Sequence, residues 1–273
     1  MLLTPEDTVE PHQDATHGGS IRVLQRDDWR ATTTRPSKPI LRARGIVKVL
    51  GTGANELQVL KGIDLDLRPG ELTLLMGPSG SGKTTLLSIL GCILTPTSGD
   101  LEVAGQSTKG LGPEGLADLR RKHVGFVFQS YNLFPTLTAT QNLLLALDLR
   151  GIKGQMASEY AARALAEVGL THRANAYPGQ MSGGEKQRVA IARALSGSSS
   201  VILADEPTAA LDGENGKAVM ALLSEVAQDP SRAVLAVTHD HRTLAYADRI
   251  IRIEDGRIVD DKASEGIRAG AGR

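Results

Sequence analysis

The chain has 273 residues, 41% of them hydrophobic and 23% charged, which is enough apolar sequence for one sizeable globular domain. Its 31 Lys and Arg residues balance 31 Asp and Glu residues, so it lacks the basic excess typical of nucleic-acid-binding proteins. The only cysteine, Cys92, excludes an intrachain disulfide and indicates a reducing compartment. We therefore expect no nucleic acid among the partners.

Residues 1–38 are polar and rich in turn-forming residues, and we expect them to be a disordered extension. Within this extension, residues 21–24 and Trp29 form a candidate docking element. The sequence shows no basic segment followed by an apolar stretch, so no signal peptide is predicted. No apolar run approaches the roughly 18 residues that a membrane span requires. These features predict a cytoplasmic chain and leave open its docking onto a membrane protein.

Regular structure is expected over residues 39–260. Three stretches suggest an antiparallel sheet, at residues 41–49, 57–67 and 100–104. Four short apolar runs that each end at a glycine or a polar residue predict parallel strands buried on both faces. These runs are 72–76, 126–128, 201–204 and 234–238. Because ligands bind beyond the carboxyl ends of parallel strands, the residues after these runs are candidates for a site.

Two segments between the second and third of these strands favour helices, at 137–149 and 157–168. We interpret them as part of a helical subdomain inserted at about residues 131–195. Nearer the end of the chain, an Asp-Gly pair predicts a β-hairpin over 251–259. Residues 261–273 are expected to be a flexible tail.

A glycine-rich loop follows the strand 72–76 and fits the pattern G-x-x-x-x-G-K-[ST]. Its glycines let backbone N–H groups turn toward phosphate oxygens, and the following helix adds partial positive charge. Lys83 is expected to reach the outer phosphates and Thr84 to bind Mg²⁺. A glycine turn with a solvated lysine is the structural alternative. The candidate nucleotide-binding residues here are Gly77, Pro78, Ser79, Gly80, Ser81, Gly82, Lys83, Thr84 and Thr85.

Two adjacent carboxylates, Asp205 and Glu206, follow the buried strand 201–204. Charged groups at such a position are costly unless they have a cation or a chemical task. Asp205 suits coordination of Mg²⁺, and Glu206 suits a general base that polarises an attacking water. The structural alternative is a turn that ends the strand before Pro207.

The segment Ser182-Gly183-Gly184-Glu185 forms a capping box at the start of a helix expected over 186–195. Gly183 and Gly184 leave the amino end of this helix bare of side chains, which also suits close approach of an anion. From these residues alone, a helix cap and an anion site are about equally supported.

Taken in order, these motifs resemble the nucleotide-binding domain of an ABC transporter. The resemblance covers about residues 40–260 and rests on the loop 77–84, Gln129, the segment 181–188, Asp205-Glu206-Pro207, Ala210-Leu211-Asp212 and His239. It implies an α/β fold of the P-loop NTPase (ABC ATPase) type. Such a fold has a mainly parallel sheet core, an antiparallel β subdomain and an inserted helical subdomain. The implied cofactors are ATP and Mg²⁺.

The resemblance also implies a role for each matching residue. Ser182, Gly183 and Gly184 resemble the signature that contacts the γ-phosphate of nucleotide held by a second copy, and Asp212 resembles the D-loop aspartate beside it. Gln129 resembles the glutamine that contacts Mg²⁺ or the attacking water and senses the membrane partner. The implied catalytic residues are Lys83, Gln129, the base Glu206 and the switch histidine His239. The implied metal ligands are Thr84, Gln129 and Asp205.

Two positions depart from the usual family pattern. The signature reads Met-Ser-Gly-Gly-Glu, where Leu-Ser-Gly-Gly-Gln is commoner. The aromatic residue that usually stacks on adenine falls near Val49 or Leu50, and neither is aromatic. Stacking on the base, and with it part of the selectivity for ATP, is therefore in question, although ATP remains the expected nucleotide.

The segments 126–133, 138–142 and 238–249 look like those of an exporter group that includes macrolide-efflux, lipoprotein-release and glycolipid-export (heterocyst-type) ATPases. This resemblance implies a head-to-tail homodimer, an integral membrane permease as partner and, often in that group, a periplasmic adaptor protein. It places the ATPase on the inner face of the cell membrane. Two alternatives are a non-transport ABC ATPase of the cofactor-assembly type and a nucleotide-regulated binding module without turnover.

Overall fold

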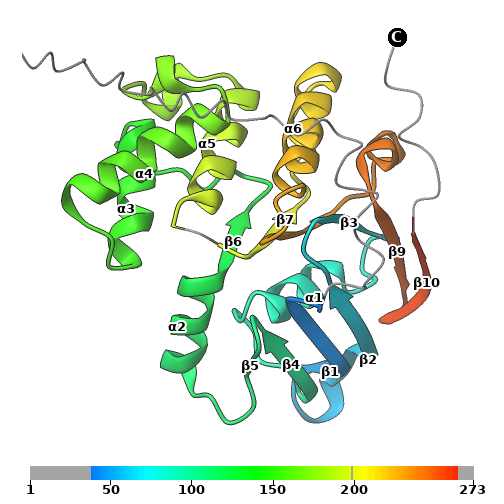
Figure 1. Cartoon of the computed structure of the whole chain (residues 1–273). Coiled ribbons are helices and arrows are strands. Elements are labelled where there is room, and N and C mark those ends of the chain that lie inside the picture. The colour runs from blue at the N-terminus through cyan, green and yellow to red at the C-terminus, as the bar shows by residue number, and fades with distance from the viewer. Residues whose placement is uncertain (1–37, 198, 264–273) are drawn as a thin grey trace, which may run out of the picture. The chain divides into compact units, whose positions relative to one another are not determined.

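A computed structural model describes residues 38–263 with the exception of residue 198 (Figure 1). The predicted extension up to residue 37, with its docking element, and the predicted tail from residue 264 lie outside the described residues. Residues 261–263, expected to belong to that flexible tail, are instead part of a β-strand. Two sheets organise the described part: one of six strands in the order β10-β9-β3-β8-β7-β6 and one of four strands in the order β2-β1-β4-β5.

The six-stranded sheet contains all four of the predicted parallel strands. Its strands are β3 (Glu71–Met76), β6 (Val124–Val127), β7 (Val201–Asp205), β8 (Ala233–Val237), β9 (Arg249–Glu254) and β10 (Arg257–Ala263). Strand β9 pairs in parallel with β3, while β10 pairs antiparallel with β9 through the predicted hairpin. Asp255 and Gly256 at the turn both have positive φ, at 44° and 72°, as a tight hairpin turn requires.

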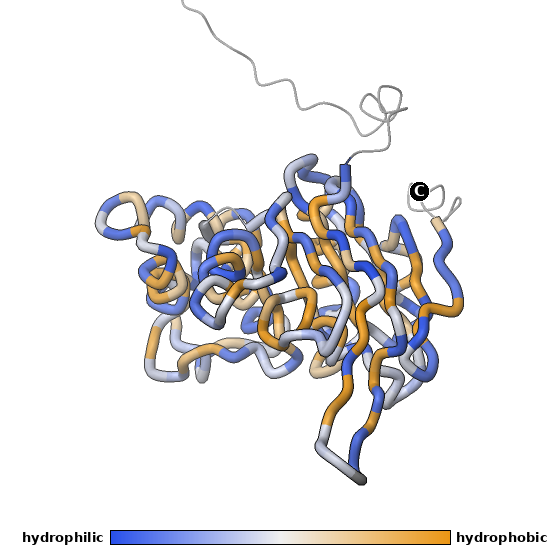
Figure 2. The backbone as a smooth tube through the Cα atoms, turned by 90° about the horizontal axis from the view of Figure 1, so that it is seen from below, coloured by the Kyte–Doolittle hydropathy of each residue, from blue (hydrophilic) through white to orange (hydrophobic). Residues whose placement is uncertain are grey.

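The four-stranded sheet confirms the predicted antiparallel stretches. It consists of β1 (Leu41–Leu50), β2 (Leu57–Leu67), β4 (Ser98–Val103) and the short β5 (Gln106–Ser107). Strand β1 pairs antiparallel with both β2 and β4. Figure 2 shows hydrophobic and hydrophilic residues alternating along several strands, as expected where one face of a sheet is buried.

Side chains of β3 alternate between two apolar cores, one on each face of the six-stranded sheet. Leu72 and Leu74 belong to the core that also contains residues of helices α3 (Ala139–Leu149) to α6 (Gly213–Val226). Leu75 belongs to the core shared with α1 (Lys83–Leu90) and the four-stranded sheet. This two-sided burial explains why the parallel strands are continuously apolar rather than alternating. The strand that leads into the glycine-rich loop is therefore fixed from both sides.

The predicted helices are confirmed, with shifted boundaries. They are α1 (Lys83–Leu90), α3 (Ala139–Leu149), α4 (Gly154–Glu167) and α5 (Gly183–Leu195). Helix α3 begins at Ala139 rather than at residue 137 because Thr138 is its N-cap, in a capping box with Gln141. Short 3₁₀ segments at Gly53–Asn55, Thr171–Arg173, Pro178–Gln180 and His241–Tyr246 complete the connections, as η2 to η5.

Two helices have no counterpart in the sequence predictions, α2 (Pro113–His123) and α6 (Gly213–Val226). Helix α2 buries only Leu119 completely and is rich in charged residues, so its sequence offers few apolar positions from which to predict a helix. Helix α6 packs Val219, Met220 and Leu223 into the same core as α3 to α5. Within residues 38–263, no helix combines the length and the apolar character that crossing a membrane would need.

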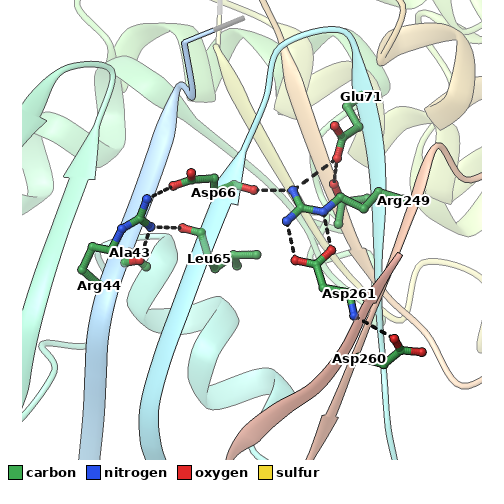
Figure 3. A network of polar contacts seen from close by, with 9 residues as sticks. Ala43, Arg44, Leu65, Asp66, Glu71, Arg249, Asp260 and Asp261 are labelled. Carbon is green, nitrogen blue, oxygen red and sulfur yellow. Dashed lines mark hydrogen bonds and ion pairs between the residues drawn. The ribbon is translucent and has the colours of Figure 1, made fainter. Parts of the chain in front are cut away.

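Arg249 connects the two sheets through one guanidinium group (Figure 3). From β9, its Nε and Nη2 atoms donate to the carboxylate of Asp261 on β10 at 2.7 and 2.6 Å. Its Nη1 atom donates to the carbonyl oxygen of Asp66 on β2 at 2.8 Å and lies 3.5 Å from the Oε1 atom of Glu71 on β3. The side chain of Asp66 pairs in turn with Arg44 on β1 at 2.8 Å. These contacts hold β1 and β2 against the strand that carries the glycine-rich loop.

Candidate functional site

The glycine-rich loop lies between the carboxyl end of β3 and the amino end of α1. Gly82 is the N-cap of α1, with a φ of 99°, and no side chain caps this helix end. A Cβ atom at Gly82 would lie 2.8 Å from Cδ2 of Leu60, whose side chain can shift, so it is the left-handed backbone conformation that favours glycine here. The first N–H groups of α1 have no side-chain partner at this cap, which makes the helix end suited to an anion.

The turn of the β9–β10 hairpin contacts this loop. The backbone N–H of Gly256 donates to the carbonyl oxygen of Ser81 at 3.2 Å, and the N–H of Lys61 on β2 donates to the carbonyl oxygen of Gly256 at 2.8 Å. A Cβ atom at Gly77 would clash with the carbonyl oxygen of Ile253. The loop is thus shaped by contacts with a segment about 175 residues later, which the local loop pattern does not reveal.

Lys83 folds back over the loop, where its Nζ atom donates to the carbonyl oxygens of Gly77 and Pro78, both at 2.8 Å. Thr84, the next residue of α1, shares a side-chain hydrogen bond with Asp205 at the end of β7. Burial raises the pKa of Asp205, and the neighbouring charge of Glu206 raises it further. A cation bound here would favour the ionised form of Asp205, because it offsets both effects.

Glu206 and His239 lie at the ends of the neighbouring strands β7 and β8. Glu206 has a φ of 48°, uncommon for a residue with a side chain, and its N–H donates to the carbonyl oxygen of Val237 at 3.0 Å. Its Oε1 atom lies 2.9 Å from Nδ1 of His239. The Glu206 side chain is 17% exposed and that of His239 71% exposed, so a largely enclosed carboxylate contacts an accessible imidazole.

These groups converge on a cavity of about 690 Å³, within the size range of ligand sites in proteins. Its lining includes residues predicted from the sequence: Gly77, Pro78, Ser79, Gly80, Gly82, Lys83, Thr84, Thr85, Gln129, Glu206 and His239. Asp205 lies behind this lining, next to Thr84, and Ser81 is buried beneath the loop with its Oγ atom unpaired. Val59 of β2 also lines the cavity, a residue that no local pattern singled out.

The structure does not place Ser182, Gly183, Gly184 or Asp212 in the lining of this cavity. Instead, Ser182 caps α5. Its side chain accepts the N–H of Glu185 at 3.2 Å, and Oε2 of Glu185 accepts the N–H of Ser182 at 2.8 Å. The predicted capping box is confirmed. The amino end of α5 is therefore a second surface, separate from the phosphate-binding loop of the same chain.

Both signature glycines pack against other parts of the same chain. A Cβ atom at Gly183 would lie 3.0 Å from the hydroxyl of Tyr131, and one at Gly184 would lie 2.7 Å from Cγ of Asn215. Asp212 in turn holds Asn215 and caps α6. Its carboxylate accepts hydrogen bonds from the backbone N–H of Asn215 at 2.9 Å and from the side-chain Nδ2 group at 2.8 Å. Gly184 thus has an intrachain steric reason to be glycine, in addition to the close approach of an anion that the sequence suggests.

The base end of the cavity has a different character. Val49 and Leu50, the positions expected to carry a stacking aromatic, do not contribute to the lining, and Leu50 is 41% exposed. The aromatic side chains among residues 38–263 are likewise missing from this lining. On the β2 side, the lining residue is the apolar Val59.

Comparison with known proteins agrees with this geometry. Residues 60–209 match the sequence family described as ABC transporter. The chain is 46% identical over 221 residues to the macrolide export ATP-binding/permease protein MacB of Escherichia coli K12, and 42% identical over 228 residues to MacB of Psychrobacter cryohalolentis. These matches cover 81% and 84% of this chain but 34% of each relative. The chain thus spans about a third of the length of these curated relatives.

Solved structures show the same fold. The dimeric ATP-binding cassette MJ0796, in a post-hydrolysis state with ADP and Pi, superposes with a TM-score of 0.75 at 37% identity, covering 83% of this chain and 99% of that one. The CbiO1 protein of Clostridium perfringens, part of the ABC transporter complex CbiONQ, superposes with a TM-score of 0.74 at 27% identity. That match covers 83% of this chain and 89% of CbiO1.

Proposed function

Because the chain belongs to the ABC transporter family, we propose that it is an ATP-binding and ATP-hydrolysing subunit that powers a separate membrane permease. The observation that carries the proposal is the cavity in which the glycine-rich loop, Gln129, Glu206 and His239 meet. Phosphoryl transfer to water requires a loop that binds a triphosphate, together with a carboxylate and an imidazole beside it.

Each of these groups has a defined task. The phosphates of ATP bind to the N–H groups at the amino end of α1 and to the ammonium group of Lys83. These N–H groups are accessible because no side chain caps the helix at Gly82. Glu206 accepts a proton from the attacking water, and His239 orients the Glu206 carboxylate through the contact at 2.9 Å. The enclosed position of Glu206 limits competing solvation of its carboxylate.

The residues around Thr84 and Asp205 suit Mg²⁺, because a hydroxyl and a carboxylate that already contact each other provide the hard oxygen ligands this ion prefers. Gln129, on the same cavity, offers a carbonyl oxygen. Thr84, Asp205 and Gln129 would hold the ion. A bound Mg²⁺ neutralises negative charge that develops on the phosphate oxygens.

A second copy of the chain is the proposed partner in the ATPase cycle. The phosphate-binding cavity and the amino end of α5 are separate surfaces of one chain. We infer that each is half of a site. A head-to-tail homodimer would bring Ser182, Gly183 and Gly184 of one copy to the nucleotide of the other. The dimeric arrangement of the MJ0796 cassette supports this proposal. Asp212 would lie at the same interface, where its contacts with Asn215 fix its carboxylate.

The proposed permease would contact a groove of about 400 Å³ between α2, β6 and α3. Its lining includes Phe126, Phe128, Ile93 and Leu149; the last two side chains are 53% and 65% exposed, and the two Phe rings stack at 5.0 Å. Exposed apolar side chains at a groove are typical of protein-binding surfaces. Gln129 follows Phe128 directly, which would connect this groove to the nucleotide cavity.

Similarity to MacB favours export as the direction of transport, with the chain held at the inner face of the cell membrane by the permease. A periplasmic adaptor protein is the further partner proposed for such an exporter. In this arrangement the adaptor contacts the permease, and the ATPase chain supplies only the mechanical work. The substrate would be selected by the permease.

The decisive experiment is affinity purification of the full chain from detergent-solubilised membranes, together with a phosphate-release assay. A transporter subunit should bring an integral membrane protein with it, and that protein should dissociate when Ile93→Asp and Leu149→Asp are combined. ATP turnover without any membrane partner would favour the cofactor-assembly type of ABC ATPase. ATP binding without turnover, in protein that forms dimers, would favour a nucleotide-regulated binding module.

A further inference from the structure

The amino end of α5 (Ser182–Glu185) carries a negative charge. The Oε2 atom of Glu185 accepts a hydrogen bond from the N–H of Ser182 at 2.8 Å, and its Oε1 atom lies 2.7 Å from Nε of Arg173. The Glu185 side chain is 13% exposed and that of Arg173 is 40% exposed. The carboxylate is therefore held between the helix end and a more exposed guanidinium group.

The capping geometry itself does not need this charge. A glutamine at position 185 could accept the same N–H through its carboxamide oxygen, since glutamine serves equally well at this position of a capping box. For the cap itself, the negative charge therefore brings no hydrogen bond that a neutral residue could not make; the second oxygen, Oε1, accepts from Nε of Arg173. It does oppose the approach of a second anion to the same helix end.

Protonation does not remove this charge at neutral pH. The hydrogen bond from the Ser182 backbone, together with Arg173, lowers the pKa of Glu185 below its ordinary value of 4.5. Arg173 is thus the group that offsets the carboxylate. Within residues 38–263, its Nη1 and Nη2 atoms form no further hydrogen bond or ion pair, so the guanidinium is committed to Glu185 alone.

We propose that Arg173 is a positioning residue that neutralises Glu185 and so keeps the amino end of α5 receptive to the γ-phosphate of nucleotide held by a second copy. The inference rests on the proposed function, because it requires a head-to-tail dimer around ATP. Arg173 acts through Glu185. It belongs to η3, outside the phosphate-binding loop and the capping box, which are the usual local patterns for such a site.

The test uses this chain with Glu206→Gln, in which dimers formed with ATP and Mg²⁺ should persist long enough for size-exclusion chromatography with light scattering. Adding Arg173→Gln should raise the ATP concentration at half-maximal dimerisation about fivefold, as expected for the loss of one partly exposed ion pair. The difference should shrink at high salt, because screening weakens the repulsion. Arg173→Lys should behave like the parent protein, since it retains the charge.

The combination of Arg173→Gln with Glu185→Gln separates electrostatics from structure. If neutralisation is the role of Arg173, removing both charges restores the parental ATP dependence; if Arg173 only stabilises the fold, the double variant remains impaired. Arg163→Gln is the matched control, since Arg163 pairs with Glu167 at 3.2 Å within α4. ATP binding to the chain's own phosphate-binding loop should be unchanged in all these variants.

The results that would overturn the role of Arg173 differ from the result that would remove the proposed dimer. An unchanged midpoint in Arg173→Gln, or failure of Glu185→Gln to restore it, overturns the role of Arg173 and leaves the proposed function intact. Failure of the Glu206→Gln protein itself to dimerise with ATP would remove the proposed dimer, and the inference with it. If Arg173→Gln is too unstable to purify, the comparison of Glu185→Gln with the parent protein decides. Glu185→Gln leaves the positive charge of Arg173 uncompensated and should lower the midpoint, whereas an unchanged midpoint would overturn the role of Arg173.

Discussion

His239 contacts Glu206 across the mouth of the nucleotide cavity, with Nδ1 of the imidazole 2.9 Å from Oε1 of the carboxylate. The two residues follow adjacent parallel strands, β7 and β8, so the sheet itself sets their separation. Glu206 is largely enclosed, whereas His239 is mostly exposed. The imidazole can therefore respond to a bound nucleotide or a second copy while the carboxylate stays in place.

Replacing His239 by alanine should lower kcat for ATP hydrolysis by about 10²-fold, with a much smaller change in KM, because the carboxylate loses its orienting partner but the phosphate-binding loop is untouched. Steady-state phosphate release would measure both constants. His241→Ala is the control, since His241 is exposed and does not line this cavity. A raised KM with an unchanged kcat would contradict the assigned role.

Replacing Glu206 by glutamine should reduce hydrolysis by about 10²–10⁴-fold while ATP binding is retained, because the carboxamide cannot accept the proton of the attacking water. Single-turnover phosphate release and equilibrium nucleotide binding would be measured on the same preparation. Glu214→Gln, on the exposed side of α6, should hydrolyse ATP normally. Rapid turnover by the Glu206→Gln protein would show that another group is the base.

Gly184→Ala should destabilise the fold by about 1–3 kcal/mol, because the added Cβ would overlap the side chain of Asn215. Denaturant titration of the nucleotide-free protein would give the change in the free energy of unfolding. Combining Gly184→Ala with Asn215→Ala should recover part of the loss. Gly179→Ala, where a Cβ meets open space, should leave the stability nearly unchanged. Equal losses at both glycines would contradict the packing argument.

Gly256→Ala should weaken ATP binding as well as stability, because the hairpin turn carries the N–H that holds the carbonyl oxygen of Ser81. The substitution meets both a φ of 72° and the backbone of Val59. Gly169→Ala is the matched control, with a φ of 70° but open space around the added Cβ. Isothermal titration with ATP should distinguish the two variants. Equal affinities would mean that the hairpin does not shape the loop.

The stability of α5 should depend on pH through Glu185. Its pKa in the folded protein is lowered by the Ser182 backbone and by Arg173, so its contribution is fully present above the ordinary value of 4.5 and is lost as the pH falls below it. Glu185→Gln should therefore lose less stability than the parent protein between neutral pH and about pH 3. Denaturation midpoints across this range provide the measurement. Parallel pH profiles for the two proteins would contradict this assignment.

Local sequence patterns predicted the strands β3, β7 and β8 well, because strands buried on both faces are continuously apolar. Helix α2 escaped prediction because it is rich in charged residues and only Leu119 is fully buried in it. Helix α6 contains Gly213 and Gly216, which weaken helical propensity, and it is defined instead by the cap at Asp212 and by packing. The boundaries of α3 and α5 followed from their capping residues rather than from hydrophobic periodicity.

The sequence by itself determined the phosphate-binding loop, the capping box at Ser182 and the order of the motifs, because hydrogen bonds and steric limits over a few residues govern such features. Only the tertiary structure decided that Gln129, Glu206 and His239 meet at that loop, whereas Ser182 does not. Only the tertiary structure shows that the N–H of Gly256 donates to the carbonyl oxygen of Ser81. These relationships join residues far apart in the chain, and they depend on strand order and on the packing of both faces of one sheet.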